Sequence, residues 1–248
     1  MKDYKWVVKE RYDKEMFDRQ AIADNMYSLI NPVGFYGEYN SVKILTHFIN
    51  LLDEYRGNHD QIRILDCGCG VGIKTRIMAE LIGNPHNVYG IDYSVNSIEH
   101  CKKMNSNITY QWGDLTQEIS FDIKFDAITA FVVFMHFSKE DEIVKALKNI
   151  YNSLKTGGVF LWYDTNVKSH WNSAEKVDGW GYSIQEMDDY AKKAGFEFIS
   201  GYGLYSVIPG IKTSTIYLSN QIKQIWLLEI MDKLPFKKNN NVRIYIKN

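Results

Sequence analysis

The sequence is poor in cysteine, in net charge and in long apolar runs. Its 248 residues include three cysteines, and an odd number of them does not indicate a disulfide framework. Cys67 and Cys69 form a Cys-x-Cys pair with no second pair at zinc spacing, so we predict no metal site. Few cysteines without a disulfide pattern favour a reducing, cytoplasmic compartment.

Charge and hydropathy exclude further classes of protein. The formal net charge is -1, which gives a nucleic-acid partner no electrostatic support. No uncharged run approaches the roughly 20 apolar residues of a membrane-spanning helix. Met1 to Trp6 lack the apolar centre of a signal peptide. We therefore expect no transmembrane segment and no nucleic-acid partner, and the sequence does not indicate an oligomeric state.

Segments typical of strands and of helices alternate from residue 62 onward. The predicted strands cover 62–66, 87–92, 108–112, 125–131, 159–163, part of 196–205, and 242–246. The predicted helices cover 73–82, 94–104, 138–154, 183–194 and 219–233. Asn239 to Asn241 is predicted to be a turn. The alternation is typical of a doubly wound α/β fold with a mostly parallel sheet.

Two helical segments precede this alternating pattern. Residues 8–29 and 42–52 have the apolar spacing of helices, and Asn31-Pro32-Val33-Gly34 is predicted to separate them. We divide the chain into an N-terminal helical cap, residues 1–58, and a core, residues 59–248. Within the core, the polar and aromatic residues 165–182 are predicted to form a substrate loop.

The first predicted strand leads into three glycines at alternate positions. Asp66 lies at the end of this strand, and Gly68, Gly70 and Gly72 follow before the next helix. Glycines let the backbone turn sharply and let a ligand approach closely, and the N-terminus of a helix offers free N–H groups. The pattern predicts a nucleotide-like cofactor at this strand end. A dinucleotide-binding loop would have its third glycine where this chain has Ile73.

The ordered motifs resemble those of the class I S-adenosylmethionine-dependent methyltransferases. The glycine loop resembles motif I of that family. The later matches are Asp92 after the second strand, Gly113-Asp114-Leu115 after the third, Phe125-Asp126 at the start of the fourth, and Leu154-Lys155-Thr156-Gly157-Gly158 before the fifth. The resemblance implies S-adenosylmethionine as the cofactor. It also implies seven strands in the order 3-2-1-4-5-7-6, the last antiparallel, with helices on both faces.

The resemblance also assigns roles to residues near the cofactor. Asp66 would hold the cofactor's ammonium group, the glycines would pack against its methionine part, and Asp114 would read adenine. Asp92 would accept both ribose hydroxyls, and Tyr93 would cover the adenine face. The alternatives are that the two acids at the strand ends cap helices and that Tyr93 is a surface ring. The full predicted set is Asp66, Gly68, Gly70, Gly72, Asp92, Tyr93, Asp114, Leu115 and Phe131.

Two residues after the fourth and fifth strands are candidates for catalysis. His136 is the candidate general base, because imidazole suits proton transfer near neutral pH. Asp164 would orient an acceptor hydroxyl or ammonium. The alternatives are that His136 only begins a helix and that Asp164 makes a loop hydrogen bond. An acceptor carboxylate or phosphate would need no base at all.

Aromatic and polar side chains outside the core motifs are candidates for binding the acceptor. Aromatic rings stack on sugar faces or surround a cationic amine, although they also fill the small core of a lid. A lone loop histidine is often only solvated. The predicted substrate residues are Tyr36, Tyr39, His170, Trp171, Trp180 and Tyr182.

The flanks suggest a narrower resemblance and a specific acceptor. Tyr27 to Pro32, Leu161 to Asp164 and Trp226 to Glu229 resemble segments of bacterial methyltransferases associated with surface-polysaccharide assembly. The predicted acceptor is therefore a small molecule or glycan, such as a sugar or a phosphorylated glycan building block. The alternatives are a nicotinamide-dependent oxidoreductase, a non-catalytic cofactor-binding protein and a nucleic-acid methyltransferase.

Overall fold

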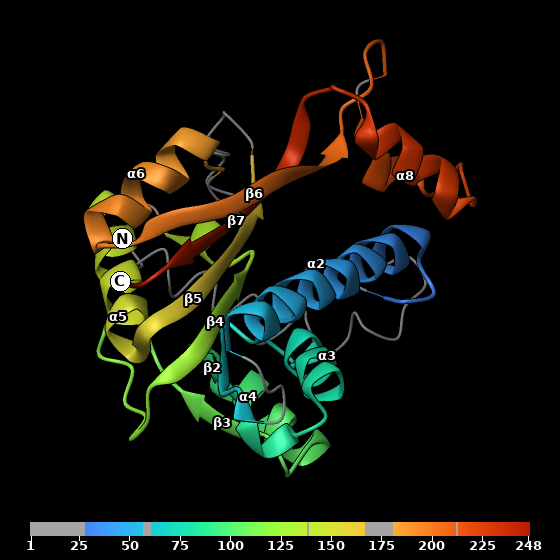
Figure 1. Ribbon diagram of the computed structural model, residues 1–248. Coiled ribbons are helices and arrows are strands. Elements are labelled where there is room, and N and C mark those ends of the chain that lie inside the picture. Colours follow the sequence, from blue (N-terminus) through green and yellow to red (C-terminus); the bar gives the residue numbers. More distant parts are fainter. Residues whose placement is uncertain (1–27, 57–60, 138, 167–180, 212) are drawn as a thin grey trace, which may run out of the picture.

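A computed structural model describes residues 28–56, 61–137, 139–166, 181–211 and 213–248 (Figure 1). Its strands form one seven-stranded sheet in the order β3-β2-β1-β4-β5-β7-β6. They are β1 (Ile64–Cys67), β2 (Val88–Asp92), β3 (Thr109–Trp112), β4 (Phe125–Phe131), β5 (Leu154–Thr165), β6 (Glu197–Ser206) and β7 (Lys238–Ile246).

The sheet has the predicted strand order and the predicted antiparallel last strand. The pairs from β3 through β5 are parallel, and β7 is antiparallel to both β5 and β6. Parallel strands end at the same edge of a sheet, so the residues that follow β1, β2 and β4 come together there. The expected doubly wound, mostly parallel architecture is confirmed.

Helices cover both faces of the sheet (Figure 1). They are α2 (Pro32–Arg56), α3 (Ile73–Ile82), α4 (Val95–Met104), α5 (Glu140–Ser153), α6 (Ile184–Ala194), α7 (Thr215–Leu218) and α8 (Ile225–Lys233), with short 3-10 turns η2 (Pro85–Asn87) and η3 (Phe134–His136). Among the described residues, no helix combines the length and the apolarity needed to cross a membrane.

Two apolar cores lie on the two faces of the sheet. Ile64 belongs to the core that includes α2, α3 and α4, whereas its neighbour Leu65 belongs to the core that includes α5 and α6. Consecutive side chains of a strand point to opposite faces, so one buried strand contributes to both cores. Helix α2 contributes Leu45 and Phe48 to the first core. The predicted division of the chain after residue 58 stays a prediction.

The predicted helix break at Asn31 to Gly34 is confirmed only at Asn31, because residues 28–31 are not helical whereas Val33 and Gly34 belong to α2. Helix α2 begins at Pro32, and the side chain of Asn31 accepts a hydrogen bond from the Val33 amide at 2.9 Å. Proline is tolerated in the first turn of a helix, because the N–H that it lacks has no intrahelical partner there. Tyr36 and Tyr39 therefore lie on a helix and not in a loop.

Two predictions near the end of the chain are wrong. The expected helix over 219–233 begins only at Ile225, because residues 219–224 are not helical, and the preceding α7 ends at Leu218. Asn240 and Asn241 belong to β7, where they pair with Thr165 and Asp164 of β5. The neighbouring strands supply backbone hydrogen bonds on both sides, which overrides the low strand propensity of asparagine.

Helices α4 and α5 begin differently. The Ser94 hydroxyl caps α4, because it accepts a hydrogen bond from the Ser97 amide at 3.1 Å. Helix α5 begins at Glu140 after Lys139, which makes no side-chain capping hydrogen bond.

Candidate functional site

The glycine loop after β1 is bonded to the end of β2. The Gly68 amide donates to the Ile91 carbonyl at 2.8 Å, and the Gly70 amide donates to Asp92 Oδ2 at 2.8 Å. Gly68, Gly70 and Gly72 all have left-handed backbone angles, with φ of 70°, 52° and 80°. Glycine is the residue that adopts such angles at little cost. The two predicted cofactor elements, the loop and the acid on β2, are therefore in direct contact.

Asp92 lies where a ribose-binding acid is expected. It is half-buried at the end of β2, and its second oxygen accepts a hydrogen bond from the Ser94 amide at 2.8 Å. Ser94, and not Asp92, is the N-cap of α4. The alternative that Asp92 caps this helix is therefore not observed.

Asp66 is buried between β4 and α3. It is 1% exposed and accepts hydrogen bonds from Thr75 Oγ1 at 2.7 Å and from Thr129 Oγ1 at 3.0 Å. Burial raises the pKa of Asp66 to about 6, against the lowering effect of the two hydroxyl donors. Asp66 thus connects the end of β1 to α3 and β4. The predicted contact of Asp66 with a cofactor ammonium stays a prediction.

An aromatic pair marks the side of the site assigned to adenine. The ring of Tyr93 lies 6.2 Å from that of Trp112, whose indole Nε1 donates to the Tyr93 carbonyl at 2.8 Å. Trp112 is 51% exposed. Trp112 is not among the residues predicted from the sequence, although a tryptophan directly before Gly113-Asp114 was a usable signal.

The two residues predicted after β3 differ in their surroundings. Asp114 Oδ1 accepts hydrogen bonds from the amide and the hydroxyl of Thr116, both at 2.8 Å, which forms a local turn. The side chain of Leu115 is 6% exposed and belongs to the core under α5 and α6. The Leu115 side chain thus packs in the core, and the predicted contact of this residue with the cofactor stays a prediction.

The end of β4 carries an unusual backbone angle. Phe131 is 9% exposed and its ring lies 5.4 Å from that of Tyr163 on β5. Val132 follows with φ of 58°, and its amide donates to the Tyr163 carbonyl at 2.8 Å. A β-branched residue in this region costs on the order of 1–3 kcal/mol and is typical of functional sites. The sequence gives no sign of this angle, because Phe131 to Phe134 has the apolar pattern of a continuing strand.

The candidate base His136 lies in η3, the short turn that follows. His136 is half-buried. Asp164 holds the backbone of this turn, because it accepts a hydrogen bond from the Met135 amide at 3.2 Å. Asp164 also accepts hydrogen bonds within β5, from Trp162 Nε1 at 3.3 Å and from the Thr165 amide at 2.9 Å. Asp164 is 0% exposed. Burial raises its pKa to about 7, although the N–H donors act in the opposite direction.

This geometry shows that Asp164 fixes the turn that carries His136. Its carboxylate is fully buried and accepts three N–H donors, one of them from that turn. Its predicted role in orienting an acceptor stays a prediction. The role of His136 as a base stays a prediction.

Tyr182 contacts the same turn from its other side. It is 4% exposed, and its hydroxyl donates to the carbonyls of Phe134 at 2.6 Å and Phe137 at 3.0 Å. Its ring lies 5.9 Å from that of Trp162 in the core under α5 and α6. The Tyr182 ring thus packs in the core, and its predicted contact with a substrate stays a prediction. His170, Trp171 and Trp180 lie outside the described residues.

Tyr36 and Tyr39 join α2 to α8. The Tyr36 hydroxyl donates to Asp232 Oδ2 at 2.8 Å, and the Tyr39 hydroxyl donates to Glu229 Oε1 at 2.9 Å. Tyr36 is 1% exposed, whereas Tyr39 is half-buried. The hydroxyl of Tyr36 is bonded to Asp232. The predicted contact of Tyr36 and Tyr39 with an acceptor stays a prediction.

No candidate metal centre adds to these groups. Among the residues that the structure describes, no cluster of three or more His, Cys, Asp or Glu side chains is arranged to hold a metal ion. The described groups at the strand ends include carboxylates, backbone amides, aromatic rings and the imidazole of His136.

Comparison with known proteins finds a match for the segment that contains the glycine loop and Asp92. A family model described as a methyltransferase domain matches residues 64–158. Sterol 24-C-methyltransferase of Debaryomyces hansenii is 25% identical over 190 residues, which cover 69% of this chain and 48% of that protein. Phosphoethanolamine N-methyltransferase 3 of Arabidopsis thaliana is 28% identical over 160 residues, which cover 60% of this chain and 31% of that protein. The chain thus spans less than half the length of these two relatives.

A solved structure extends the likeness to the whole chain. Magnesium protoporphyrin IX methyltransferase from Synechocystis PCC 6803, solved with bound S-adenosylmethionine, superposes with a TM-score of 0.64 and 14% identity, covering 100% of this chain and 99% of that one. At this identity the likeness shows a common fold. Residues 64–158 thus match a methyltransferase domain, and the chain has the fold of an S-adenosylmethionine-binding methyltransferase.

Proposed function

We propose that this chain transfers a methyl group from S-adenosylmethionine to an oxygen or nitrogen atom of a small-molecule acceptor. One observation carries the proposal: the glycine loop and Asp92 are hydrogen-bonded at the carboxyl ends of β1 and β2. The matched methyltransferase domain and the fold shared with an S-adenosylmethionine complex support the same cofactor.

The residues at the strand ends fit such a cofactor. The three glycines leave the loop without side chains, the Asp92 carboxylate suits ribose hydroxyls, and the rings of Tyr93 and Trp112 offer an apolar face for adenine. When bound, the cofactor supplies a methyl group that is already activated by its positive sulfur. The protein therefore has to position the acceptor, exclude water and receive a proton.

His136 is the residue that we propose for proton transfer. Its turn is held by Asp164 on one side and by Tyr182 on the other, so the imidazole has a fixed place beside β4. A hydroxyl acceptor loses its proton during the transfer, and an amine acceptor has to arrive uncharged. Imidazole suits both tasks near neutral pH.

A sugar or a phosphorylated glycan building block is the acceptor that we propose in finer detail. The flanking segments and the polar aromatic loop support it. The support from the loop is partial, because Tyr182 is in the core and three of the other selected residues lie outside the described chain. The relatives named above carry sterol, phosphoethanolamine and porphyrin in their names, so a panel of acceptors has to include these chemical classes.

Calorimetric titration with S-adenosylhomocysteine tests the proposed function. We expect one site per chain in the wild type. Asp92→Ala should bind roughly tenfold or more weakly, because a charged hydrogen-bond partner is lost. Asp122→Ala, an exposed acid between β3 and β4, is the matched control. If the protein binds NADH and does not bind S-adenosylhomocysteine, the proposal is wrong and the oxidoreductase alternative is supported.

A further inference from the structure

One ion pair joins α2 to the first turn of α3, directly after the glycine loop. Lys74, the second residue of α3, donates a hydrogen bond to Glu38 Oε1 on α2. Helix α3 begins at Ile73 after Gly72, so Lys74 lies two residues from the last glycine of the loop. Burial raises the pKa of Asp66 at the end of β1, and the nearby Lys74 charge is among the groups that oppose the rise. The ion pair therefore lies beside the strand end where the cofactor is proposed to bind.

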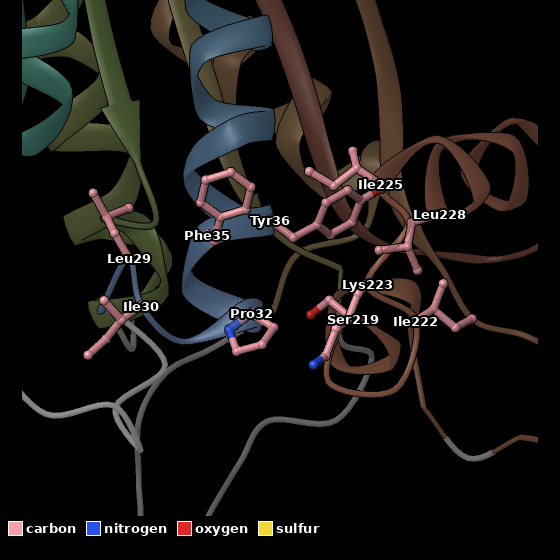
Figure 2. A pocket seen from close by; sticks show the side chains of 10 residues that line it. All are labelled: Leu29, Ile30, Pro32, Phe35, Tyr36, Ser219, Ile222, Lys223, Ile225 and Leu228. Carbon is pink, nitrogen blue, oxygen red and sulfur yellow. The ribbon is translucent and has the colours of Figure 1, made fainter.

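Helix α2 directs Glu38 away from α8. Tyr36, two residues earlier, lies with Ile225 in an apolar cluster between α2 and α8 and donates to Asp232 (Figure 2). Residues two apart lie on nearly opposite sides of a helix, so Glu38 faces α3 and the sheet. Burial raises the pKa of Tyr163 on β5, and the Glu38 carboxylate is among the charges that add to the rise. Glu38 is thus close to groups on both α3 and β5.

The second carboxylate oxygen of Glu38 is buried without a hydrogen bond. Glu38 Oε2 has no partner among the described residues, although each oxygen of a carboxylate is a strong acceptor. A buried charged oxygen without a donor is costly, so such an atom in a folded protein indicates a ligand or an ordered group that supplies one. The side chains of Glu38 and Lys74 are still 17% and 25% exposed, so the pair borders on solvent.

Asp66 differs from Glu38 in its hydrogen bonds. The family resemblance assigns the cofactor's ammonium to Asp66, but both oxygens of Asp66 already accept from hydroxyls, Oδ2 from Thr75 at 2.7 Å and Oδ1 from Thr129 at 3.0 Å. Asp66 is also only 1% exposed. The acid beside the glycine loop that has an oxygen without a donor is therefore Glu38 on α2.

A cation and an anion side by side complement a group that carries both charges. Lys74 has three N–H donors, of which Glu38 Oε1 accepts one, so Lys74 can also donate to a carboxylate. Glu38 Oε2 can accept from an ammonium. Charge-assisted hydrogen bonds of both kinds are stronger than neutral ones. The pair therefore suits an α-amino-acid group, and S-adenosylmethionine ends in such a group.

We propose that Glu38 and Lys74 bind the α-amino-acid end of S-adenosylmethionine, with the ammonium on Glu38 Oε2 and the carboxylate on Lys74. This rests on the proposed function and adds two positioning residues outside the ordered motifs. Glu38 also precedes the matched methyltransferase domain, which covers residues 64–158. Helix α2 is then part of the cofactor site and not only a cover for the sheet.

Titration with S-adenosylhomocysteine and with methylthioadenosine tests the proposal, because methylthioadenosine lacks the amino-acid end. We expect the wild type to prefer S-adenosylhomocysteine. Glu38→Gln and Lys74→Met should each weaken its binding by roughly tenfold or more, since a charged partner is lost. Binding of methylthioadenosine should not change in either variant, which also shows that the variants are folded.

Glu229→Gln is the matched control, because Glu229 on α8 forms a similar ion pair with Lys43 of α2. We expect it to leave both titrations unchanged. A double variant that exchanges the charges, Glu38→Lys with Lys74→Glu, separates ligand binding from structure. It can re-form the ion pair between α2 and α3, but its ammonium and carboxylate then face ligand groups of the same charge. Its resistance to denaturant should recover, while its binding of S-adenosylhomocysteine stays weak.

Affinity for S-adenosylhomocysteine that either single variant leaves at the wild-type level would overturn the proposal. So would wild-type affinity in the exchanged double variant, since the pair would then only join two helices. The exchanged variant also decides the matter if a single variant does not fold. A wild type that binds neither compound contradicts the proposed function, whereas a wild type that binds both equally contradicts only the assignment of Glu38 and Lys74.

Discussion

At the scale of the residue, buried carboxylates organise the site. Asp66 and Asp164 lie at the ends of β1 and β5. Asp66 accepts hydrogen bonds from α3 and β4, and Asp164 accepts them from η3 and from its own strand. Asp92 is only half-buried and accepts a hydrogen bond from the glycine loop. Burial therefore distinguishes Asp66 and Asp164 from the partly exposed Asp92.

Asp164→Ala should lower kcat with little change in the affinity for S-adenosylhomocysteine. The substitution leaves the Met135 and Thr165 amides without their acceptor, which costs about 1–3 kcal/mol each and loosens the turn of His136. Asp164→Asn keeps an acceptor oxygen and should restore much of kcat. Steady-state kinetics and ligand titration measure both effects. Equal loss in the Asn and Ala variants would instead support a direct role of the carboxylate.

Stability should fall as the pH rises from about 4 to about 7. Burial raises the pKa of Asp66 to about 6 and that of Asp164 to about 7, above the values of about 4 for unfolded carboxyl groups. The native state then binds more protons than the unfolded state, so this contribution is complete below pH 4 and is lost as pH rises through 6 and 7. At about 1.4 kcal/mol per pKa unit, Asp66 contributes on the order of 3 kcal/mol and Asp164 on the order of 4 kcal/mol.

Denaturant titrations at several pH values measure this slope. Asp66→Asn should flatten the part of the curve between about pH 4 and 6, because the titrating group is removed. A variant whose stability keeps the wild-type pH dependence would show that the pKa of Asp66 is not raised.

At the scale of the element, the glycine loop fits closely under the turn after β4. A Cβ atom on Gly68 would lie 2.4 Å from Val133 Cγ2. Val133 follows the strained Val132, so the left-handed angle after β4 and the glycine after β1 form one packed unit. The sequence motif alone suggests that the glycine makes room for a ligand, whereas the structure shows that it also makes room for Val133.

Gly68→Ala should destabilise the protein and weaken the binding of S-adenosylhomocysteine. Two causes combine: an alanine at φ of 70° costs about 1–2 kcal/mol, and the methyl group clashes with Val133. Gly83→Ala is the control, because Gly83 has the same φ of 70° and no atom lies within 4 Å of the place that its new methyl group would take. We expect Gly83→Ala to show the backbone cost alone, with unchanged ligand binding. Equal effects of the two substitutions on binding would contradict the packing argument.

At the scale of the whole molecule, the segment between β6 and β7 fastens α2 to the sheet. Asp232 provides the shared contact, since it accepts hydrogen bonds from α2, α7 and the end of β6. Lys238 of β7 donates to the Asp232 carbonyl at 2.7 Å, which extends the connection to the last strand. The N-terminal and C-terminal parts of the described chain thus meet at one side chain.

Asp232→Ala should lower the free energy of unfolding by about 2–4 kcal/mol. It leaves the hydroxyl of the fully buried Tyr36 and a backbone amide without their acceptor. Glu229→Gln is the control on the same helix, because its side chain is 27% exposed and its contacts with Lys43 and Tyr39 are accessible to solvent. We expect a loss below about 1 kcal/mol there. Denaturant unfolding measures both, and similar losses would contradict the special role of Asp232.

The elements that the sequence predicts well are those set by short-range patterns. The strand over 125–131 and the helix over 73–82 agree with β4 and α3 residue for residue, because apolar runs and glycines delimit them locally. The helix start at Pro32 and the strand at Asn240 were missed. At Pro32 the reason is local, because proline is tolerated in the first turn of a helix and Asn31 accepts a hydrogen bond there. At Asn240, pairing with neighbouring strands outweighs the low strand propensity of asparagine.

The sequence by itself determined the alternation of strands and helices and the position of the glycine loop, because apolar periodicity and glycines act through neighbours along the chain, and the order of the strands came from the resemblance to the class I methyltransferases. Only the tertiary structure decided that Asp164 and Tyr182 hold a turn, that Tyr36 donates to Asp232, and that Asp92 meets Gly70. Burial and hydrogen bonding of a polar side chain depend on which distant elements pack against it, and residue type does not encode that.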